Sequence, residues 1–202
     1  MKDKKVLIFD VGNVLFSYRW HEMLLEYGLS EEEACVADEK VFDGAIWREM
    51  DLGIKSSEDI MDYFSRKHPE YHDLIRWFFS HPEKMPIPHT EIWKRIHLLK
   101  EKGYKIYLLS NYPRELFAFH TKDADFMKDI DGKVVSYEIH VTKPNLDIYK
   151  HLLEKYSLNP KECAFFDDRE ENTKAAEALG ILSYTVTSEE YLRGVLDVLC
   201  CC

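Results

Sequence analysis

Polar residues that can do chemistry follow four separate apolar runs of this chain. They are Asp10 after Val6–Phe9, Ser110 and Asn111 after Tyr104–Leu109, Lys143 shortly after Gly132–Ile139, and Asp167 with Asp168 after Glu162–Phe166. Carboxylate oxygens suit Mg²⁺, and a carboxylate can attack phosphorus to form an aspartyl-phosphate. A lysine and a hydroxyl can hold the phosphate oxygens and neutralise their charge. The set predicts phosphoryl transfer through an aspartate, with Mg²⁺ as the cofactor.

Each of these groups also has an ordinary structural explanation when it is taken alone. A serine, asparagine or aspartate behind a strand can cap a turn or a helix, and a lysine can simply be exposed to solvent. The combination favours a site because the groups follow successive apolar runs.

The elements that must position these groups are strands alternating with helices. Short apolar runs with β-branched and aromatic residues, followed by turn residues, predict buried parallel strands. A fifth such run is Ile181–Thr187, and helical stripes separate the later runs. Strands joined through helices imply a parallel sheet covered on both faces. The carboxyl ends of parallel strands share one edge, where α/β proteins bind ligands. We therefore expect an α/β fold that brings the polar groups together.

The stretch from about Ser17 to His81 shows no strand pattern and is predicted to be helical. Ser56 with Asp59 matches a capping box at one helix start. Two prolines within Met85–His89 predict a stiff boundary segment before the alternating pattern resumes.

Composition limits the classes of protein and partner. The 202 residues are 46% hydrophobic and 32% charged, with a net charge of -10, which disfavours nucleic acid or an anionic membrane as partner. No apolar run of about 20 residues or signal sequence is found, so we expect a cytoplasmic protein. The five cysteines, three of them Cys200, Cys201 and Cys202, do not form a disulfide framework, and this terminal trio has no assigned role.

Four short motifs in order resemble those of the haloacid dehalogenase (HAD) superfamily. They are FDVGN (Phe9–Asn13), LLSN (Leu108–Asn111), Lys143-Pro144 and FFDD (Phe165–Asp168). The surrounding sequence is most similar to the branch that contains alpha-D-glucose-1-phosphate phosphatase. The resemblance implies a Rossmann-like parallel sheet core of residues 1–16 and 86–202. It also implies a small helical cap, residues 17–85, inserted after the first strand.

The resemblance also implies a role for each site residue. Asp10 would be the catalytic nucleophile and a Mg²⁺ ligand. The other metal contacts would come from the Gly12 carbonyl, from Asp168 and, through water, from Asp167. The phosphate would be bound by Ser110, Asn111 and Lys143.

One position departs from the commonest pattern of the superfamily. A second aspartate usually stands two residues after the nucleophile, where it protonates the leaving group and then activates water. This chain has Gly12 there, and proton transfer of this kind is worth roughly 10²–10⁴-fold in rate. Another group or water would have to do this work, or turnover would be slow. The alternatives are a non-catalytic protein that binds a phosphorylated metabolite and a 2-haloacid dehalogenase, in which the paired aspartates would have no task.

The predicted substrate is a small phosphorylated metabolite, with a sugar phosphate favoured and nucleotides or FMN as alternatives. Arg19, Trp20, Trp47 and Arg48 lie in or beside the predicted cap and could meet a sugar by stacking and hydrogen bonding. The alternative is that both tryptophans belong to the core of the cap and both arginines are solvated.

Overall fold

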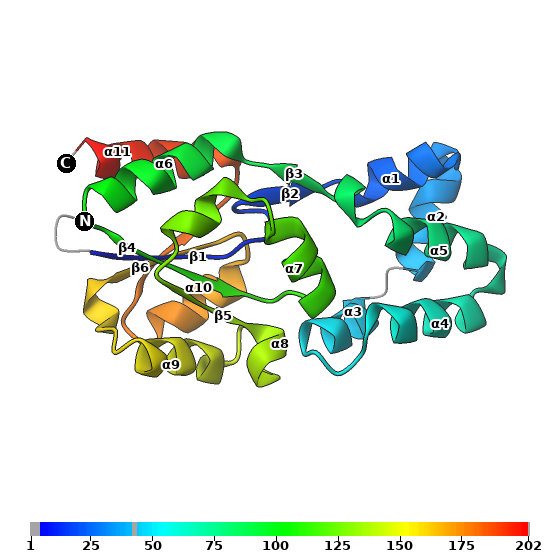
Figure 1. Ribbon diagram of the computed structural model, residues 1–202. Coiled ribbons are helices and arrows are strands. Elements are labelled where there is room, and N and C mark those ends of the chain that lie inside the picture. The colour runs from blue at the N-terminus through cyan, green and yellow to red at the C-terminus, as the bar shows by residue number, and fades with distance from the viewer. Residues whose placement is uncertain (1–4, 42–43, 202) are drawn as a thin grey trace.

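A five-stranded parallel sheet forms the centre of the computed structural model, which describes residues 5–41 and 44–201. Its strand order is β5-β4-β1-β6-β7, so the first strand lies in the middle (Figure 1). The strands are β1 (Val6–Phe9), β4 (Lys105–Ser110), β5 (Gly132–Val135), β6 (Cys163–Asp167) and β7 (Leu182–Thr185). Every neighbouring pair is parallel, which confirms the predicted fold class.

Alternate residues of β1 pack against opposite layers of helices, as a strand buried on both faces requires. Leu7 and Phe9 belong to the apolar cluster that includes residues of α6 and α11, whereas Val6 and Ile8 belong to the cluster that includes residues of α9 and α10. The core helices are α6 (Thr90–Glu101), α7 (Arg114–Thr121), α8 (Ser136–Ile139), α9 (Leu146–Lys155), α10 (Glu170–Glu177) and α11 (Glu189–Cys200). Short 3₁₀ turns are η1 (Pro69–Tyr71), η2 (Pro82–Lys84), η3 (Asp125–Asp129) and η4 (Pro160–Glu162).

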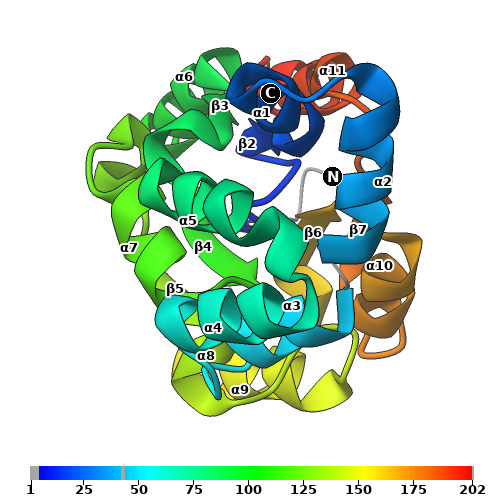
Figure 2. The same cartoon turned by 90° about the vertical axis from the view of Figure 1, so that its right-hand side faces the viewer.

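Five helices among the described residues between 20 and 80 lie together beside the sheet and are here called the helical unit. They are α1 (Trp20–Tyr27), α2 (Glu31–Val41), α3 (Gly44–Asp51), α4 (Ser57–Lys67) and α5 (His72–Ser80). The capping box at the start of α4 is present, since Ser56 and Asp59 each accept a hydrogen bond from the other's backbone N–H. Figure 2 shows the helical unit in front of the sheet. The division of the chain at residues 16/17 and 85/86 stays a prediction.

A two-stranded ribbon connects the sheet to the helical unit. It pairs β2 (Phe16–Tyr18) with β3 (Pro86–Pro88) in antiparallel register. The prediction that no strand begins near Ser17 was therefore wrong. Three residues are too few to show an alternating pattern, and the prolines of the partner strand cannot donate ladder hydrogen bonds, which hides β3 in the sequence.

The third predicted strand is shorter than expected. Gly132–Ile139 was predicted as one strand, but β5 ends at Val135 and the next four residues form the single turn α8. Ser136 explains the change, because its hydroxyl accepts a hydrogen bond from the Tyr112 N–H and donates one to the Asp51 carbonyl. Such side-chain bonds to backbone compete with continuation of the ladder.

Two of the three terminal cysteines lie within the described residues. Cys200 ends α11 and Cys201 follows it, while Cys202 lies outside the described residues. The four described cysteines are free thiols. None of the described helices is long and apolar enough to cross a lipid bilayer.

Candidate active site

The strand register brings the predicted polar groups to one edge of the sheet. Phe9 of β1 is level with Leu108 of β4 and with Phe166 of β6. Asp10 is therefore the first residue beyond β1, and its N–H donates to the Phe166 carbonyl at 2.9 Å. The carboxyl ends of parallel strands lie at the same edge of a sheet. Ser110 and Asp167 therefore reach this edge from the two neighbouring strands.

One carboxylate oxygen of Asp10 is held by three donors. Its Oδ1 accepts hydrogen bonds from the Val11 N–H at 2.7 Å and from the Ser110 hydroxyl at 2.6 Å, and Lys143 Nζ lies 2.9 Å from it. No group within residues 5–41 and 44–201 hydrogen-bonds Oδ2. The residue is only 7% exposed. Asp10 thus has a fixed orientation with one oxygen available for attack or for a metal.

Lys143 is a buried cation that lies between two of these carboxylates. Its Nζ lies 2.9 Å from Asp10 Oδ1 and 2.6 Å from Asp167 Oδ2, and it donates to the Leu109 carbonyl at 2.8 Å. Burial lowers the pKa of the ammonium, but Asp10 and Asp167 outweigh this and raise the pKa above its ordinary value. Lys143 is therefore positively charged and can bind an anionic ligand.

Asn111 holds the backbone of Lys143 on both sides. Its side-chain oxygen accepts from the Lys143 N–H at 2.8 Å, and its amide nitrogen donates to the Lys143 carbonyl at 3.0 Å. These bonds explain how a lysine from a loop reaches the strand edge. In the structure the Asn111 side chain positions Lys143 and also lines the pocket, and its predicted contact with the phosphate stays a prediction.

Three carboxylates converge at this edge. Ligand oxygens of Asp10, Asp167 and Asp168 lie within 4.8 Å of one another. Both oxygens of Asp167 have partners, because Oδ1 accepts from the Arg169 N–H at 2.9 Å and from the Asn172 amide at 2.8 Å while Oδ2 faces Lys143. Asp168 is half-buried and accepts one bond at Oδ2, from Asn13 at 3.0 Å.

The charge balance of this cluster fits a divalent cation. Burial raises the pKa of Asp10 to about 7, and neighbouring carboxylates add to the rise that Lys143 opposes. Burial also raises the pKa of Asp168, and the Asp167 charge acts in the same direction. The single positive charge of Lys143 does not balance the negative charge of these carboxylates. A cation that prefers oxygen ligands, such as Mg²⁺, would supply the missing positive charge.

The aromatic ring of Tyr18 fills the space beside Gly12. A Cβ placed on Gly12 would lie 3.1 Å from Tyr18 Cε2 and 3.3 Å from its hydroxyl oxygen. In the common superfamily pattern the side chain of a catalytic acid extends from this residue. Here the Tyr18 ring from β2 lies in that space instead. Burial raises the pKa of Tyr18 well above its usual value.

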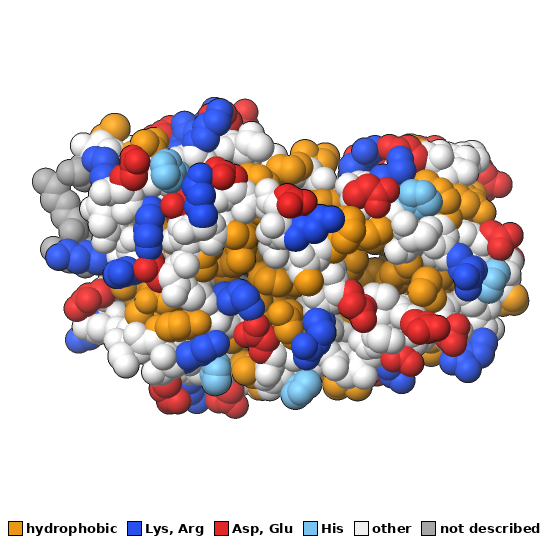
Figure 3. Space-filling view, in the orientation of Figure 1, with side chains coloured by type: hydrophobic (Ala, Val, Ile, Leu, Met, Phe, Trp, Pro, Cys, Tyr) orange, Lys and Arg blue, Asp and Glu red, His pale blue; other side chains and the backbone are white. Residues whose placement is uncertain are grey.

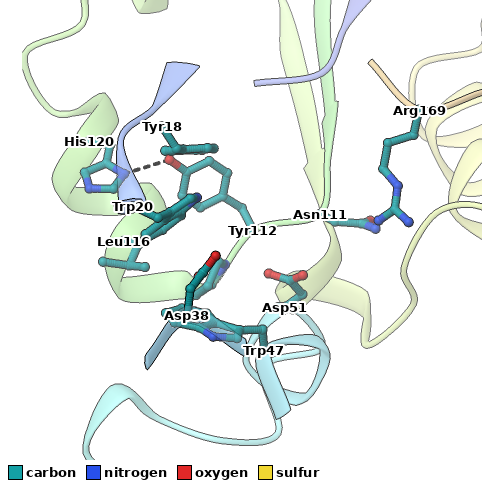
Figure 4. A pocket seen from close by; sticks show the side chains of 11 residues that line it. Tyr18, Trp20, Asp38, Trp47, Asp51, Asn111, Tyr112, Leu116, His120 and Arg169 are labelled. Atoms are coloured by element: carbon teal, nitrogen blue, oxygen red, sulfur yellow. Dashed lines mark hydrogen bonds between the residues drawn. The ribbon is translucent and has the colours of Figure 1, made fainter. Parts of the chain in front are cut away.

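A pocket of about 420 Å³ opens between the strand edge and the helical unit. Figure 3 shows apolar side chains along the seam between these two parts. Among the described residues, those that line the pocket (Figure 4) are Tyr18, Trp20, Asp38, Trp47, Asp51, Asn111, Tyr112, Pro113, Leu116, His120 and Arg169. Its volume falls in the usual range for small-molecule sites.

The structure brings two of the four predicted substrate residues to this pocket. Trp20 and Trp47 line it with ring centroids 5.7 Å apart, and each also stacks on a phenylalanine of α5. Arg19 instead pairs with Glu26, and Arg48 is exposed, so neither lines the pocket. The tryptophans therefore belong both to the core of the helical unit and to the pocket wall.

Several pocket residues were not predicted from the sequence. Tyr112 donates its hydroxyl proton to His120 Nδ1 at 2.7 Å, because His120 Nε2 donates to the Pro82 carbonyl at 2.9 Å. Tyr112 directly follows the LLSN motif, which was a usable signal. Asp51 stands at the end of α3, and no motif or periodicity marks it as a site residue.

Comparisons with known proteins agree with this arrangement. A curated relative is the sesquiterpene phosphatase astK of Aspergillus oryzae, 24% identical over 185 residues, which are 91% of this chain and 90% of that protein. A predicted HAD-like family hydrolase of Porphyromonas gingivalis superposes with a TM-score of 0.75 at 22% identity, covering 97% of this chain and 98% of that one.

A third similar protein has been solved with ligands. An HAD family enzyme of Bacteroides thetaiotaomicron, in complex with magnesium and inorganic phosphate, superposes with a TM-score of 0.66 at 25% identity, covering 90% of this chain and 93% of that one. A family model for the haloacid dehalogenase-like hydrolases matches residues 4–180. With the ordered motifs converging at one sheet edge, this match shows that the chain belongs to the haloacid dehalogenase-like hydrolases.

Proposed function

We propose that this protein is a Mg²⁺-dependent phosphatase that hydrolyses a small phosphorylated metabolite through an aspartyl-phosphate on Asp10. The observation that carries the proposal is the geometry at Asp10. One carboxylate oxygen is fixed by Ser110 and Lys143, while the other is left without a hydrogen-bond partner among the described residues. A nucleophile needs this combination of orientation and one available lone pair.

The other residues at the strand edge have roles that follow from their contacts. Asp10, Asp168 and the Gly12 carbonyl would hold Mg²⁺, with Asp167 assisting through water. The ion would neutralise the phosphate charge and hold it against the carboxylate. Lys143 and Ser110 would bind the phosphate oxygens from the other side. Asn111 keeps Lys143 in place through the two backbone hydrogen bonds described above.

Two of the similar proteins support the reaction class. One is named a phosphatase, and another was solved with magnesium and inorganic phosphate. A dehalogenase would use the nucleophile without a metal, which leaves the converging Asp167 and Asp168 unexplained. A protein that only binds a phosphorylated metabolite would need no nucleophile with a free oxygen.

The pocket would bind the leaving group and determine substrate specificity. We favour a sugar phosphate, as in the alpha-D-glucose-1-phosphate phosphatase branch, because rings of Tyr18, Trp20, Trp47 and Tyr112 can stack on a sugar. The same apolar wall would accept the isoprenoid part of a sesquiterpene phosphate. Nucleotides and FMN are further candidates of suitable chemistry.

The test is phosphate release from p-nitrophenyl phosphate, sugar phosphates, nucleotides, FMN and farnesyl phosphate. It is run with Mg²⁺ and with EDTA, for the wild type and for Asp10→Asn. We expect Mg²⁺-dependent release that Asp10→Asn abolishes. Release that survives in Asp10→Asn would overturn the aspartyl mechanism. A folded wild type that binds Mg²⁺ and releases no phosphate from any compound would favour the binding protein.

A further inference from the structure

A phosphatase of this kind must return a proton to the departing oxygen, and Gly12 has no side chain to do so. We propose that Asp51, which reaches the site from the helical unit, is the acid that protonates the leaving group. This inference rests on the proposed function. It assigns to a side chain of α3 the task that the common superfamily pattern gives to a residue beside the nucleophile.

Asp51 lies at the point where α3 meets the pocket. Figure 4 shows its carboxylate reaching from the end of this helix toward Asn111, inside the ring of lining side chains. The residue is partly buried, and no described residue donates a hydrogen bond to its carboxylate. Asn111 in turn holds Lys143, which contacts the nucleophile. A partly buried carboxyl in a pocket, with no hydrogen bond from the described residues, is available to a ligand.

The backbone around Asp51 is docked on the core at three successive residues. The Ser136 hydroxyl donates to the Asp51 carbonyl, and His140 Nδ1 donates to the Leu52 carbonyl at 2.7 Å. Gly53 has φ +67, and a Cβ placed there would lie 3.0–3.2 Å from atoms of Tyr137. These contacts tie the end of α3 to α8. The backbone that carries the Asp51 side chain therefore has a fixed place on the core.

The acidity of Asp51 suits proton transfer in both directions near neutral pH. Burial raises its pKa to about 7, against the opposing charges of Lys143 and Arg169. A general acid is most effective when its pKa is close to the working pH. The titratable or charged groups around it are Lys143, Arg169, Asp38, Tyr18, Tyr112 and His140.

Tyr18 is a second candidate for the proton donor, and it is the weaker one. Its hydroxyl lies beside Gly12, but burial and the charge of Asp10 raise its pKa well above the usual value. A phenol of that kind holds its proton too tightly to give it up and take it back in each cycle. Tyr18 therefore shapes the space beside Asp10, and Asp51 carries the proton.

The proton balance has two steps. In the first, an Asp10 oxygen bonds to phosphorus, the bond from phosphorus to the leaving oxygen breaks, and the Asp51 proton passes to that oxygen. In the second, the Asp51 carboxylate takes a proton from water, whose oxygen bonds to phosphorus. The bond to Asp10 then breaks, inorganic phosphate leaves, and both carboxyl groups return to their starting states.

The test uses two kinds of leaving group. p-Nitrophenolate departs readily without a proton, whereas an alkyl alkoxide does not. We expect Asp51→Asn to lower release from the best alkyl monoester by about 10²–10⁴-fold, and release from p-nitrophenyl phosphate by less than about 10-fold. Asp51→Glu keeps a carboxyl and is expected to recover part of the alkyl activity. Asp62→Asn, an exposed site on α4, removes the same charge and is expected to change neither rate.

The outcomes separate this inference from the proposed function. Equal losses with both esters in Asp51→Asn, or a wild type that cleaves only aryl esters, would overturn the role of Asp51. A selective loss of alkyl activity in Tyr18→Phe that is missing in Asp51→Asn would transfer the role to Tyr18. Release that persists in Asp10→Asn would instead overturn the aspartyl mechanism.

Discussion

At the scale of single residues, the site depends on one buried ammonium that faces two carboxylates. Lys143 Nζ lies within 3 Å of both Asp10 and Asp167. We expect Lys143→Met to lower the free energy of unfolding by about 3–5 kcal/mol, because it leaves buried carboxylates without their cation. The measurement is urea denaturation in EDTA, where no added metal can take over the missing charge.

An exposed lysine provides the matched control for that change. Lys150 pairs with Asp147 at 3.2 Å on the surface of α9, and half of its side chain is exposed. Lys150→Met is expected to change the free energy of unfolding by less than about 1 kcal/mol, since surface ion pairs contribute little. Equal losses in the two variants would show that the Lys143 contacts do not stabilise the fold.

At the scale of elements, the contact between α3 and α8 sets where Asp51 lies. Gly53 combines φ +67 with a close approach to Tyr137. We expect Gly53→Ala to push the end of α3 away from α8 and to lower alkyl phosphate turnover by about 10-fold or more, since small displacements of a catalytic group cost rate. Steady-state release from the alkyl and p-nitrophenyl esters would show whether the loss falls on the alkyl substrate.

A substitution at Gly28 is the control that distinguishes the effect of the contact with Tyr137 from the effect of backbone strain at a positive φ. It ends α1 with φ +113, and a Cβ placed there would meet nothing within 4 Å. Gly28→Ala therefore carries the cost of a left-handed alanine without displacing a neighbour, and is expected to lower stability by about 1 kcal/mol with no selective effect on alkyl esters. A similar selective loss in Gly28→Ala would argue against the docking role of Gly53.

The sequence predicts the sheet elements well where strands are apolar and buried. β1 has the predicted bounds, and β4 and β6 differ by one residue at each end. Prediction fails where a contact distant in the chain decides the local structure. Ser136 ends β5 because it binds backbone groups of residues 51 and 112, and neither partner is visible in the local pattern.

The same distinction applies to the candidate site. Asp10 follows one buried strand, and Ser110 and Asp167 end the two neighbouring strands, so the topology alone brings them to one edge. Asp51 gave no signal, because its place depends on how a helix from another part of the chain docks on the core. Arg19 was placed near the substrate by its position in the sequence, but the exposed pairing with Glu26 takes it elsewhere.

At the scale of the whole molecule, the acid in the pocket makes stability depend on pH. The pKa of Asp51 is about 7 in the folded protein against an ordinary value of 3.8. The folded state therefore binds this proton more tightly, and the free energy of unfolding falls as pH rises from about 4 through about 7. Asn does not titrate. We expect the Tm of Asp51→Asn, relative to wild type, to rise between pH 5 and pH 8.

Thermal unfolding of both proteins in EDTA, at the same salt concentration, measures this difference. The other acidic groups of the site are present in both proteins, so their contributions cancel in the comparison. Asp62→Asn is again the control, because its carboxylate is exposed, and its Tm difference from wild type is expected to be flat. A flat difference for Asp51→Asn would contradict the raised pKa.

The contact between Gly12 and Tyr18 restricts how this sequence can change during evolution. Tyr18 lies on β2, next to the start of α1, so the residue that fills the space beside the nucleophile belongs to the connection that carries the helical unit. A single substitution of Gly12 by aspartate brings the new side chain against the Tyr18 ring. The Tyr18 ring must then give way, or a smaller residue at position 18 must make the room, and the smaller residue would remove part of the pocket wall. An acid supplied by α3 and a glycine after the nucleophile are therefore features that natural selection would tend to keep or lose together.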